Sequence, residues 1–125
     1  MNSIVFDIDG TICPIKKENE KYEDLVPNKD MIKKVRELKE EGYKIIFFTA
    51  RNMRTYKGNL DLILQNTKPI LEEWLKKWNI PYDELLFGKP YPGKLGFYVD
   101  DKTLRPDELL SMSREDILSF LEGEH

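Results

Sequence analysis

Two aspartates near the start of the chain are separated by one residue, in the run Asp7-Ile8-Asp9-Gly10-Thr11. They directly follow a short apolar run, so we expect them at the end of a buried strand. There the two carboxylates point in different directions, which lets Asp7 attack a phosphorus atom while Asp9 reaches the leaving oxygen. Backbone amides near Gly10 and Thr11 would add a nest for phosphoryl oxygens. The run therefore suits phosphoryl transfer.

Polar residues follow three later apolar runs: Thr49 with Arg51 and Asn52, then Lys89, then Asp100 with Asp101. Phosphoryl transfer needs donors for the phosphoryl oxygens and positive charge beside the nucleophile. We expect the Thr49 hydroxyl to donate to a phosphoryl oxygen and Lys89 to neutralise both the nucleophile and the phosphoryl group. Arg51 and Asn52 are candidates to bind phosphate or substrate, with a solvated loop as a nearly equal alternative.

A divalent cation is expected with these carboxylates. Several carboxylates in one cleft repel one another, and a hard cation with oxygen ligands keeps them ionised. Mg²⁺ suits phosphate chemistry, and Asp7, the backbone carbonyl of Asp9 and Asp100 form the natural ligand set. A calcium loop is disfavoured because Cys13 and Ile15 stand where further oxygen ligands should be.

The apolar patterns indicate the elements that position these groups. Strands are predicted at residues 4–6, 43–49, 84–87 and 96–99. Helices are predicted from Asn28 to Gly42, over residues 69–79, and from Ser113 to Leu121. Residues 50–66 are expected to form a long loop with a short helix, and whether they cover the site stays open.

This order of elements predicts an α/β fold, because parallel strands need crossover connections. We expect a Rossmann-like three-layer sandwich with a mostly parallel central sheet, formed by one domain over residues 1–125 without a separate cap domain. Ligands bind at the carboxyl ends of the strands in such sheets, and the candidate residues all follow strands.

Composition favours a small anionic substrate over a polymer. The net charge is −3, from 20 basic and 23 acidic residues, which gives no electrostatic case for a long nucleic acid or an anionic membrane. Cys13 is the only cysteine, which suits a reducing compartment, and no signal-peptide core or membrane-spanning run is present. We therefore expect a cytoplasmic protein, and a homo-oligomer stays open.

The four polar segments resemble the ordered motifs of the haloacid dehalogenase-like (HAD) superfamily. The matching segments are Asp7-Ile8-Asp9-Gly10-Thr11, Phe48-Thr49-Ala50-Arg51-Asn52, Gly88-Lys89-Pro90 and Val99-Asp100-Asp101. The resemblance implies that Asp7 forms an aspartyl-phosphate and that Asp9 is the general acid and then the base. It also implies phosphoryl contacts from Thr49 and Lys89, and magnesium binding at Asp100 with Asp101 in support.

The wording of the motifs and the short chain look most like the small bacterial capsule or polysaccharide biosynthesis phosphatases. That resemblance implies a hydrolase acting on a phosphorylated sugar or a related small metabolite. Two alternatives stay open. One is a phosphatase of nucleotides or nucleic-acid ends, and the other is a non-catalytic phosphate- or metal-binding module, which would have no need of a proton donor at Asp9.

Overall fold

The computed structural model describes residues 2–124. The chain divides into two compact units, the first ending at Tyr91 and the second beginning at Pro92. The expectation of a single domain over the whole chain stays a prediction.

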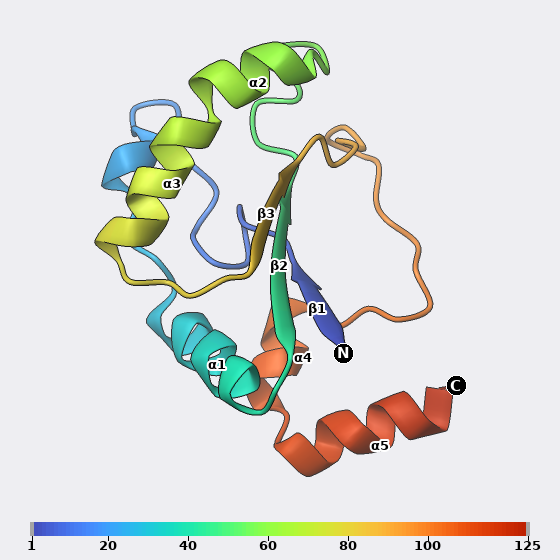
Figure 1. Cartoon of the computed structure of the whole chain (residues 1–125). Helices are drawn as coiled ribbons and strands as arrows, with labels where there is room; N and C mark the ends of the chain where they lie inside the picture. Colours follow the sequence, from blue (N-terminus) through green and yellow to red (C-terminus); the bar gives the residue numbers. More distant parts are fainter. Residues whose placement is uncertain (1, 125) are drawn as a thin grey trace. The chain divides into compact units, whose positions relative to one another are not determined.

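A parallel sheet of three strands forms the centre of the first unit. The strands are β1 (Ser3–Phe6), β2 (Lys44–Thr49) and β3 (Glu84–Phe87), in the spatial order β1-β2-β3. Phe6 lies beside Phe47, and Thr49 lies beside Phe87. All three carboxyl ends therefore meet at one edge of the sheet, as Figure 1 shows. This confirms the predicted α/β fold class, in which helices flank a parallel sheet.

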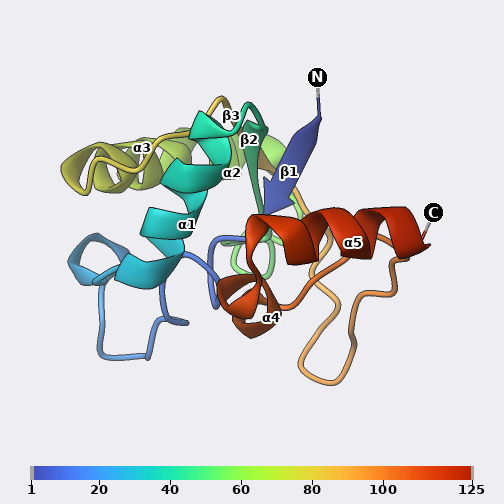
Figure 2. The same ribbon diagram turned by 90° about the horizontal axis from the view of Figure 1, so that it is seen from below.

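Helices connect the strands of the first unit. They are the 3₁₀ helix η1 (Tyr22–Asp24) and the α-helices α1 (Lys29–Glu40), α2 (Leu60–Asn66) and α3 (Lys68–Lys77). Figures 1 and 2 show α1 and α3 on the same side of the sheet. The short helix expected within residues 50–66 is α2, and η1 was not predicted.

The predicted signals of α1 are confirmed. The Asn28 side chain accepts a hydrogen bond from the Met31 amide at 3.1 Å, which satisfies one free donor of the first turn. The helix stops before Gly42, which has a φ of 102° that an L side chain rarely adopts. Its buried residues are Met31, Ile32, Val35 and Leu38, at helical spacing.

The core of the first unit forms on one face of β2. Ile45 and Phe47 are fully buried on this face. The ring of Phe47 meets the Phe6 ring edge-on at 6.1 Å and the Tyr82 ring at 5.6 Å between centroids. These contacts fix the strands relative to one another, and with them the loops that leave the carboxyl edge.

Asp83 ties the start of β3 to the neighbouring strand. Its carboxylate accepts from the Ile45 amide at 2.8 Å and from Lys39 Nζ at 2.8 Å, and its own amide donates to the Ile45 carbonyl at 2.8 Å. The hydrogen bond from Lys39 is the first cause that holds the pKa of Asp83 below its ordinary value, followed by the bond from Ile45.

The second unit contains the helices α4 (Pro106–Ser111) and α5 (Arg114–Glu124). The predicted cap of α5 is confirmed, because the Ser113 hydroxyl accepts from the Asp116 amide at 3.1 Å and the Asp116 carboxylate accepts from the Ser113 amide at 3.0 Å. The helix α4 was not predicted. Within residues 2–124, no helix is both long and apolar enough to cross a membrane.

The strand predicted at residues 96–99 is wrong. The segment is irregular, and the side chains of Phe97 and Val99 are 80% and 88% exposed. Before it, the chain turns so tightly that a Cβ on Gly96 would collide with the Pro92 carbonyl oxygen. Apolar and aromatic residues form a strand only where a neighbouring strand pairs with them through backbone hydrogen bonds. Residues 96–99 pair with no strand among the described residues.

Candidate active site

The loop that follows β1 is wound tightly around the carbonyl oxygen of Ile8. This oxygen accepts from the amides of Thr11, Ile12 and Cys13 at 3.1, 2.8 and 3.3 Å. Ile8 and Ile12 are fully buried. The loop is therefore rigid on both sides of Asp9, which fixes where the two aspartates leave the backbone.

Gly10 allows the loop to close, with a φ of 89°. Its amide donates to the Cys13 carbonyl at 2.7 Å, and the Thr11 amide donates to Ile8. The anion nest expected at the amides of Gly10 and Thr11 is therefore not formed in this structure, because both donors are used within the loop. A role for these two residues in phosphate binding stays a prediction.

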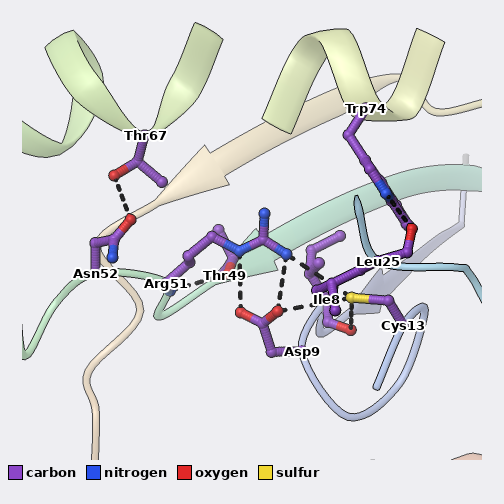
Figure 3. A network of polar contacts seen from close by, with 9 residues as sticks. All are labelled: Ile8, Asp9, Cys13, Leu25, Thr49, Arg51, Asn52, Thr67 and Trp74. Carbon is purple, nitrogen blue, oxygen red and sulfur yellow. Dashed lines mark hydrogen bonds and ion pairs between the residues drawn. The ribbon is translucent and has the colours of Figure 1, made fainter. Parts of the chain in front are cut away.

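Asp9 is held by Arg51, from the loop after β2. The Arg51 Nε lies 3.1 Å from Asp9 Oδ2, and the Nη2 lies 2.8 Å from Oδ1 (Figure 3). The Arg51 side chain is 2% exposed and that of Asp9 is 24% exposed. This is a bidentate pair with little access of solvent to the arginine, which fixes both the position and the rotation of the carboxylate.

Arg51 is itself enclosed by three groups. Its backbone amide donates to Thr49 Oγ1 at 3.0 Å. The centre of its guanidinium lies 4.1 Å from the centroid of the Tyr22 ring, and its Nη2 lies 3.8 Å from Cys13 Sγ. The sequence predicted that the Arg51 guanidinium binds phosphate or substrate, whereas in the structure it binds Asp9. A direct role of Arg51 in phosphate binding stays a prediction.

The thiol of Cys13 completes this buried cluster. Its Sγ lies 3.6 Å from Asp9 Oδ1, and the residue is 2% exposed. Burial raises the pKa of Cys13 from 9.0 to about 12, with the charge of Asp9 as the second cause. The side chain is therefore a neutral thiol at physiological pH and not a nucleophile.

Asp7 has a different cationic partner, Lys89. The Lys89 Nζ lies 3.7 Å from Asp7 Oδ1. Lys89 reaches this place from the loop after β3, where its amide donates to the Thr49 carbonyl at 3.2 Å and the preceding Gly88 has a φ of 86°. Burial raises the pKa of Asp7, the charge of Lys89 opposes this, and the charge of Asp9 adds to it.

The residues of the first unit fit part of a magnesium site. Burial raises the pKa of the Asp7 carboxyl even though the charge of Lys89 opposes this, so a further cation beside it would stabilise its ionised form. Mg²⁺ keeps several waters and needs only one or two carboxylates beside substrate phosphate. Asp7 with the Asp9 carbonyl fits that requirement. Across residues 2–124 no three Asp, Glu, Cys or His side chains gather into a metal-binding group.

The side chains of Thr49 and Asn52 have different hydrogen-bond partners. Thr49 is 1% exposed at the end of β2, and its hydroxyl accepts from Arg51 while keeping its own proton to donate. Asn52, with a φ of 61°, donates to Thr55 Oγ1 at 3.2 Å and accepts from Thr67 Oγ1 at 2.7 Å. Figure 3 shows it pointing toward Thr67. Asn52 thus shapes its loop, and its predicted contact with substrate stays a prediction.

Asp100 and Asp101 lie in the second unit. The Asp100 carboxylate accepts from the Lys102 amide at 2.9 Å, and this hydrogen bond is the first cause that holds the pKa of Asp100 below its ordinary value. Both residues are exposed. Their role in binding a metal with Asp7 stays a prediction.

Sequence reasoning missed Tyr22, which belongs to the environment of Asp9. The signal was present in the sequence, because Tyr22 is the one aromatic residue between Cys13 and Asn28, in a stretch dominated by charged residues. Burial raises the pKa of its hydroxyl, and the charge of Asp9 adds to this effect. Tyr22 is therefore neutral at physiological pH and presents an aromatic face to Arg51.

Comparison with solved structures finds a similar protein that matches the chain over its full length. A crystal structure of a structural genomics target from Vibrio cholerae superposes with a TM-score of 0.92 and 43% sequence identity, and the match covers 100% of both chains. No protein-family model and no curated protein matches the chain.

Two more distant structures share the fold alone. A chain of the Pnkp1/Rnl/Hen1 complex matches with a TM-score of 0.53 and 18% identity, over 97% of this chain and 42% of that one. A chain of the Pnkp1/Rnl/Hen1 RNA repair complex matches with a TM-score of 0.52 and 15% identity, over 98% and 39%. At full coverage and 43% identity, by contrast, the chain belongs to the same family as the Vibrio cholerae protein.

Proposed function

We propose that this protein is a magnesium-dependent phosphomonoester hydrolase of the HAD type, in which Asp7 is the nucleophile and Asp9 is the general acid and base. The resemblance of its motifs to that superfamily suggested this chemistry, and the geometry of the first unit supports it. The substrate is proposed to be a phosphorylated sugar or related small metabolite of capsule or polysaccharide biosynthesis.

One observation carries the proposal. The two carboxylates are two residues apart, yet each has its own cation from a different loop: Asp7 has Lys89 at 3.7 Å, and Asp9 has the bidentate Arg51. An acidic turn without a catalytic role would not need a separate cationic partner for each carboxylate. A monodentate lysine leaves Asp7 free to attack, while the paired Asp9 is fixed in orientation.

These positions support the following proposed chemistry. Asp9 must enter the reaction protonated, with one carboxyl oxygen released from Arg51. The Asp7 carboxylate then attacks phosphorus, the bond from phosphorus to the leaving oxygen breaks, and that oxygen takes up the Asp9 proton. Asp9 then accepts a proton from water as that water attacks the phosphorus of the acyl phosphate, which releases inorganic phosphate and restores Asp7. Lys89 and Thr49 hold phosphoryl oxygens. Asp7 and the Asp9 carbonyl would hold Mg²⁺, which would supply positive charge to the phosphoryl group when bound.

A second substrate class is a phosphate at an RNA end. We keep this substrate class because two structures of similar fold belong to the Pnkp1/Rnl/Hen1 complex. One of the two structures is described as an RNA repair complex. The net charge of −3 favours a small substrate over a long polynucleotide. Sugar phosphates, nucleotides and a short RNA with a terminal phosphate should therefore be assayed side by side.

The test is release of inorganic phosphate with and without Mg²⁺ for the wild-type chain and for Asp7→Asn. We expect activity that needs Mg²⁺ and that Asp7→Asn abolishes, because an amide cannot form the acyl phosphate. Asp30→Asn, in the first turn of α1, is a matched control that keeps the activity. Full activity in Asp7→Asn would refute the proposal, and no turnover of any substrate by the wild-type chain would favour the non-catalytic alternative.

A further inference from the structure

The ring of Tyr22 lies over the guanidinium that holds Asp9. The centroid of the ring is 4.1 Å from Arg51 Cζ, which is contact distance for a stacked aromatic and guanidinium pair. Lys16 Nζ also lies over this ring, 5.4 Å from its centroid. The guanidinium therefore uses its edge for the carboxylate and its face for the aromatic ring. A planar arginine can make both contacts at once, whereas a lysine cannot.

The segment that carries Tyr22 is anchored to the body of the first unit. The indole Nε1 of Trp74, on α3, donates to the Leu25 carbonyl at 2.7 Å, as Figure 3 shows. Leu25 is 3% exposed, and its amide donates to the Tyr22 carbonyl at 3.3 Å. On the far side, the Asn28 amide donates to the Ile12 carbonyl at 2.8 Å. Tyr22 is thus held in place by the fold.

The position of the ring has a direct electrostatic consequence. The Arg51 side chain is 2% exposed, and the Tyr22 ring lies over its guanidinium at 4.1 Å, so the ring contributes to its burial. Excluding water strengthens the charge-assisted hydrogen bonds to Asp9 and limits the orientations that the carboxylate can take. Loss of the ring would let the guanidinium tilt and would loosen Asp9 without removing any group that touches a substrate.

We propose that Tyr22 is a positioning residue for Asp9, which it orients by stacking on Arg51. The inference rests on the proposed function, because it takes Asp9 to be the acid and base. Tyr22 lies in the segment between Cys13 and Asn28, which is rich in charged residues. We infer that this segment keeps the Asp9 carboxyl aligned with the leaving oxygen.

The first test compares Tyr22→Leu with Tyr22→Phe in Mg²⁺-dependent hydrolysis of phenyl phosphate, whose leaving oxygen is basic enough to need a proton. We expect Tyr22→Leu to lower kcat about tenfold and to leave KM within about twofold, since a misoriented acid slows chemistry and not binding. Tyr22→Phe keeps the aromatic face and recovers most of that loss. Tyr82→Leu is the control, because it removes a ring that packs on Phe47 and does not touch the pair. An unchanged kcat in Tyr22→Leu would overturn the inference, as would an equal loss in Tyr82→Leu.

The second test needs no enzymatic activity. Exchange of the Arg51 Nε proton with water, followed by nitrogen-15 NMR, reports directly on the pair. We expect exchange at least about tenfold faster in Tyr22→Leu than in the wild-type chain or in Tyr22→Phe. Unchanged exchange would overturn the inference. If exchange is faster in Tyr22→Leu but the wild-type chain hydrolyses no phosphate ester, the contact between Tyr22 and Arg51 is supported and the proposed function is refuted. Failure of the inference and failure of the proposed function therefore give different results.

Discussion

The guanidinium of Arg51 donates to both carboxylate oxygens of Asp9, at 3.1 Å from Nε and 2.8 Å from Nη2. The two residues come from the loops after adjacent parallel strands, β1 and β2. The arginine is almost wholly buried, so the pair is shielded from water on that side. Asp7, two residues earlier, is instead paired with Lys89, whose Nζ lies 3.7 Å from Asp7 Oδ1. The fold thus gives two neighbouring aspartates different electrostatic environments.

Arg51→Met should destabilise the protein, because it leaves the partly buried Asp9 carboxylate without its partner. We expect a loss of about 3 kcal/mol in the free energy of unfolding, measured by urea denaturation. Arg51→Lys should recover only part of it, since an ammonium group cannot make the bidentate contact. The double variant Asp9→Asn with Arg51→Met should lose less than the sum of the single variants. Additive losses would show that the pair contributes no coupling energy.

Trp74→Phe should loosen the segment that carries Tyr22. It removes the donor to the buried Leu25 carbonyl at 2.7 Å. Trp78→Phe is the matched control, because Trp78 Nε1 is buried and has no hydrogen-bond partner among the described residues. We expect Trp74→Phe to cost about 1–2 kcal/mol more than Trp78→Phe in urea denaturation. Equal losses would mean that the indole hydrogen bond does not contribute.

Cys13 should resist thiol reagents in the folded protein. Its pKa of about 12 leaves almost no thiolate at neutral pH, and its side chain is 2% exposed. We expect labelling by a disulfide reagent at about pH 8 to be at least about a hundredfold slower than in urea. The rate of absorbance change on mixing measures this directly. Equal rates in the folded and unfolded protein would contradict the packing of Cys13 against Asp9 and Arg51.

Asp83→Ala should destabilise the protein in a pH-dependent way. The pKa of Asp83 is lower in the folded state than its ordinary value of 3.8, because Lys39 and the Ile45 amide donate to its carboxylate. Its contribution to stability is therefore complete above that ordinary value and is lost as the pH falls through the lowered one. The urea midpoint of Asp83→Ala should be below that of wild type at about pH 7, with the gap closing as the pH falls through the lowered pKa of Asp83. Glu84→Ala, which breaks the exposed contact with Lys44, should change the midpoint little. A gap that persists in acid would show that the effect is not electrostatic.

Elements with local signals were predicted well. The helix α1 has its cap at Asn28, apolar residues at helical spacing and a stop at Gly42, so its own sequence determines where it begins and ends. The segment at 96–99 has equally apolar residues, but a strand also needs a neighbour, which its own sequence does not supply. The prediction there was wrong because pairing is not a local property.

The sequence predicted which loops of the first unit meet at the carboxyl edge of the sheet, and it did not predict how their side chains pair. Because Asp9 and Arg51 each follow a strand of a parallel sheet, their meeting at one edge could be expected. That the guanidinium turns to Asp9 depends on where Tyr22 lies, and Tyr22 is placed by a hydrogen bond between Trp74 and Leu25 that no sequence spacing reveals.

The central claim, that Asp7 accepts the phosphoryl group, is tested most directly by trapping. The chain is mixed with Mg²⁺ and a phosphate ester labelled with phosphorus-32, quenched in acid and mapped by mass spectrometry. The ester is p-nitrophenyl phosphate, whose leaving group departs without a proton, so Asp9→Asn can still form the acyl phosphate. This variant lacks the base for the second step and should accumulate label on the peptide that contains Asp7. Asp7→Asn should carry none. Label on another residue, or label that persists in Asp7→Asn, would contradict the account.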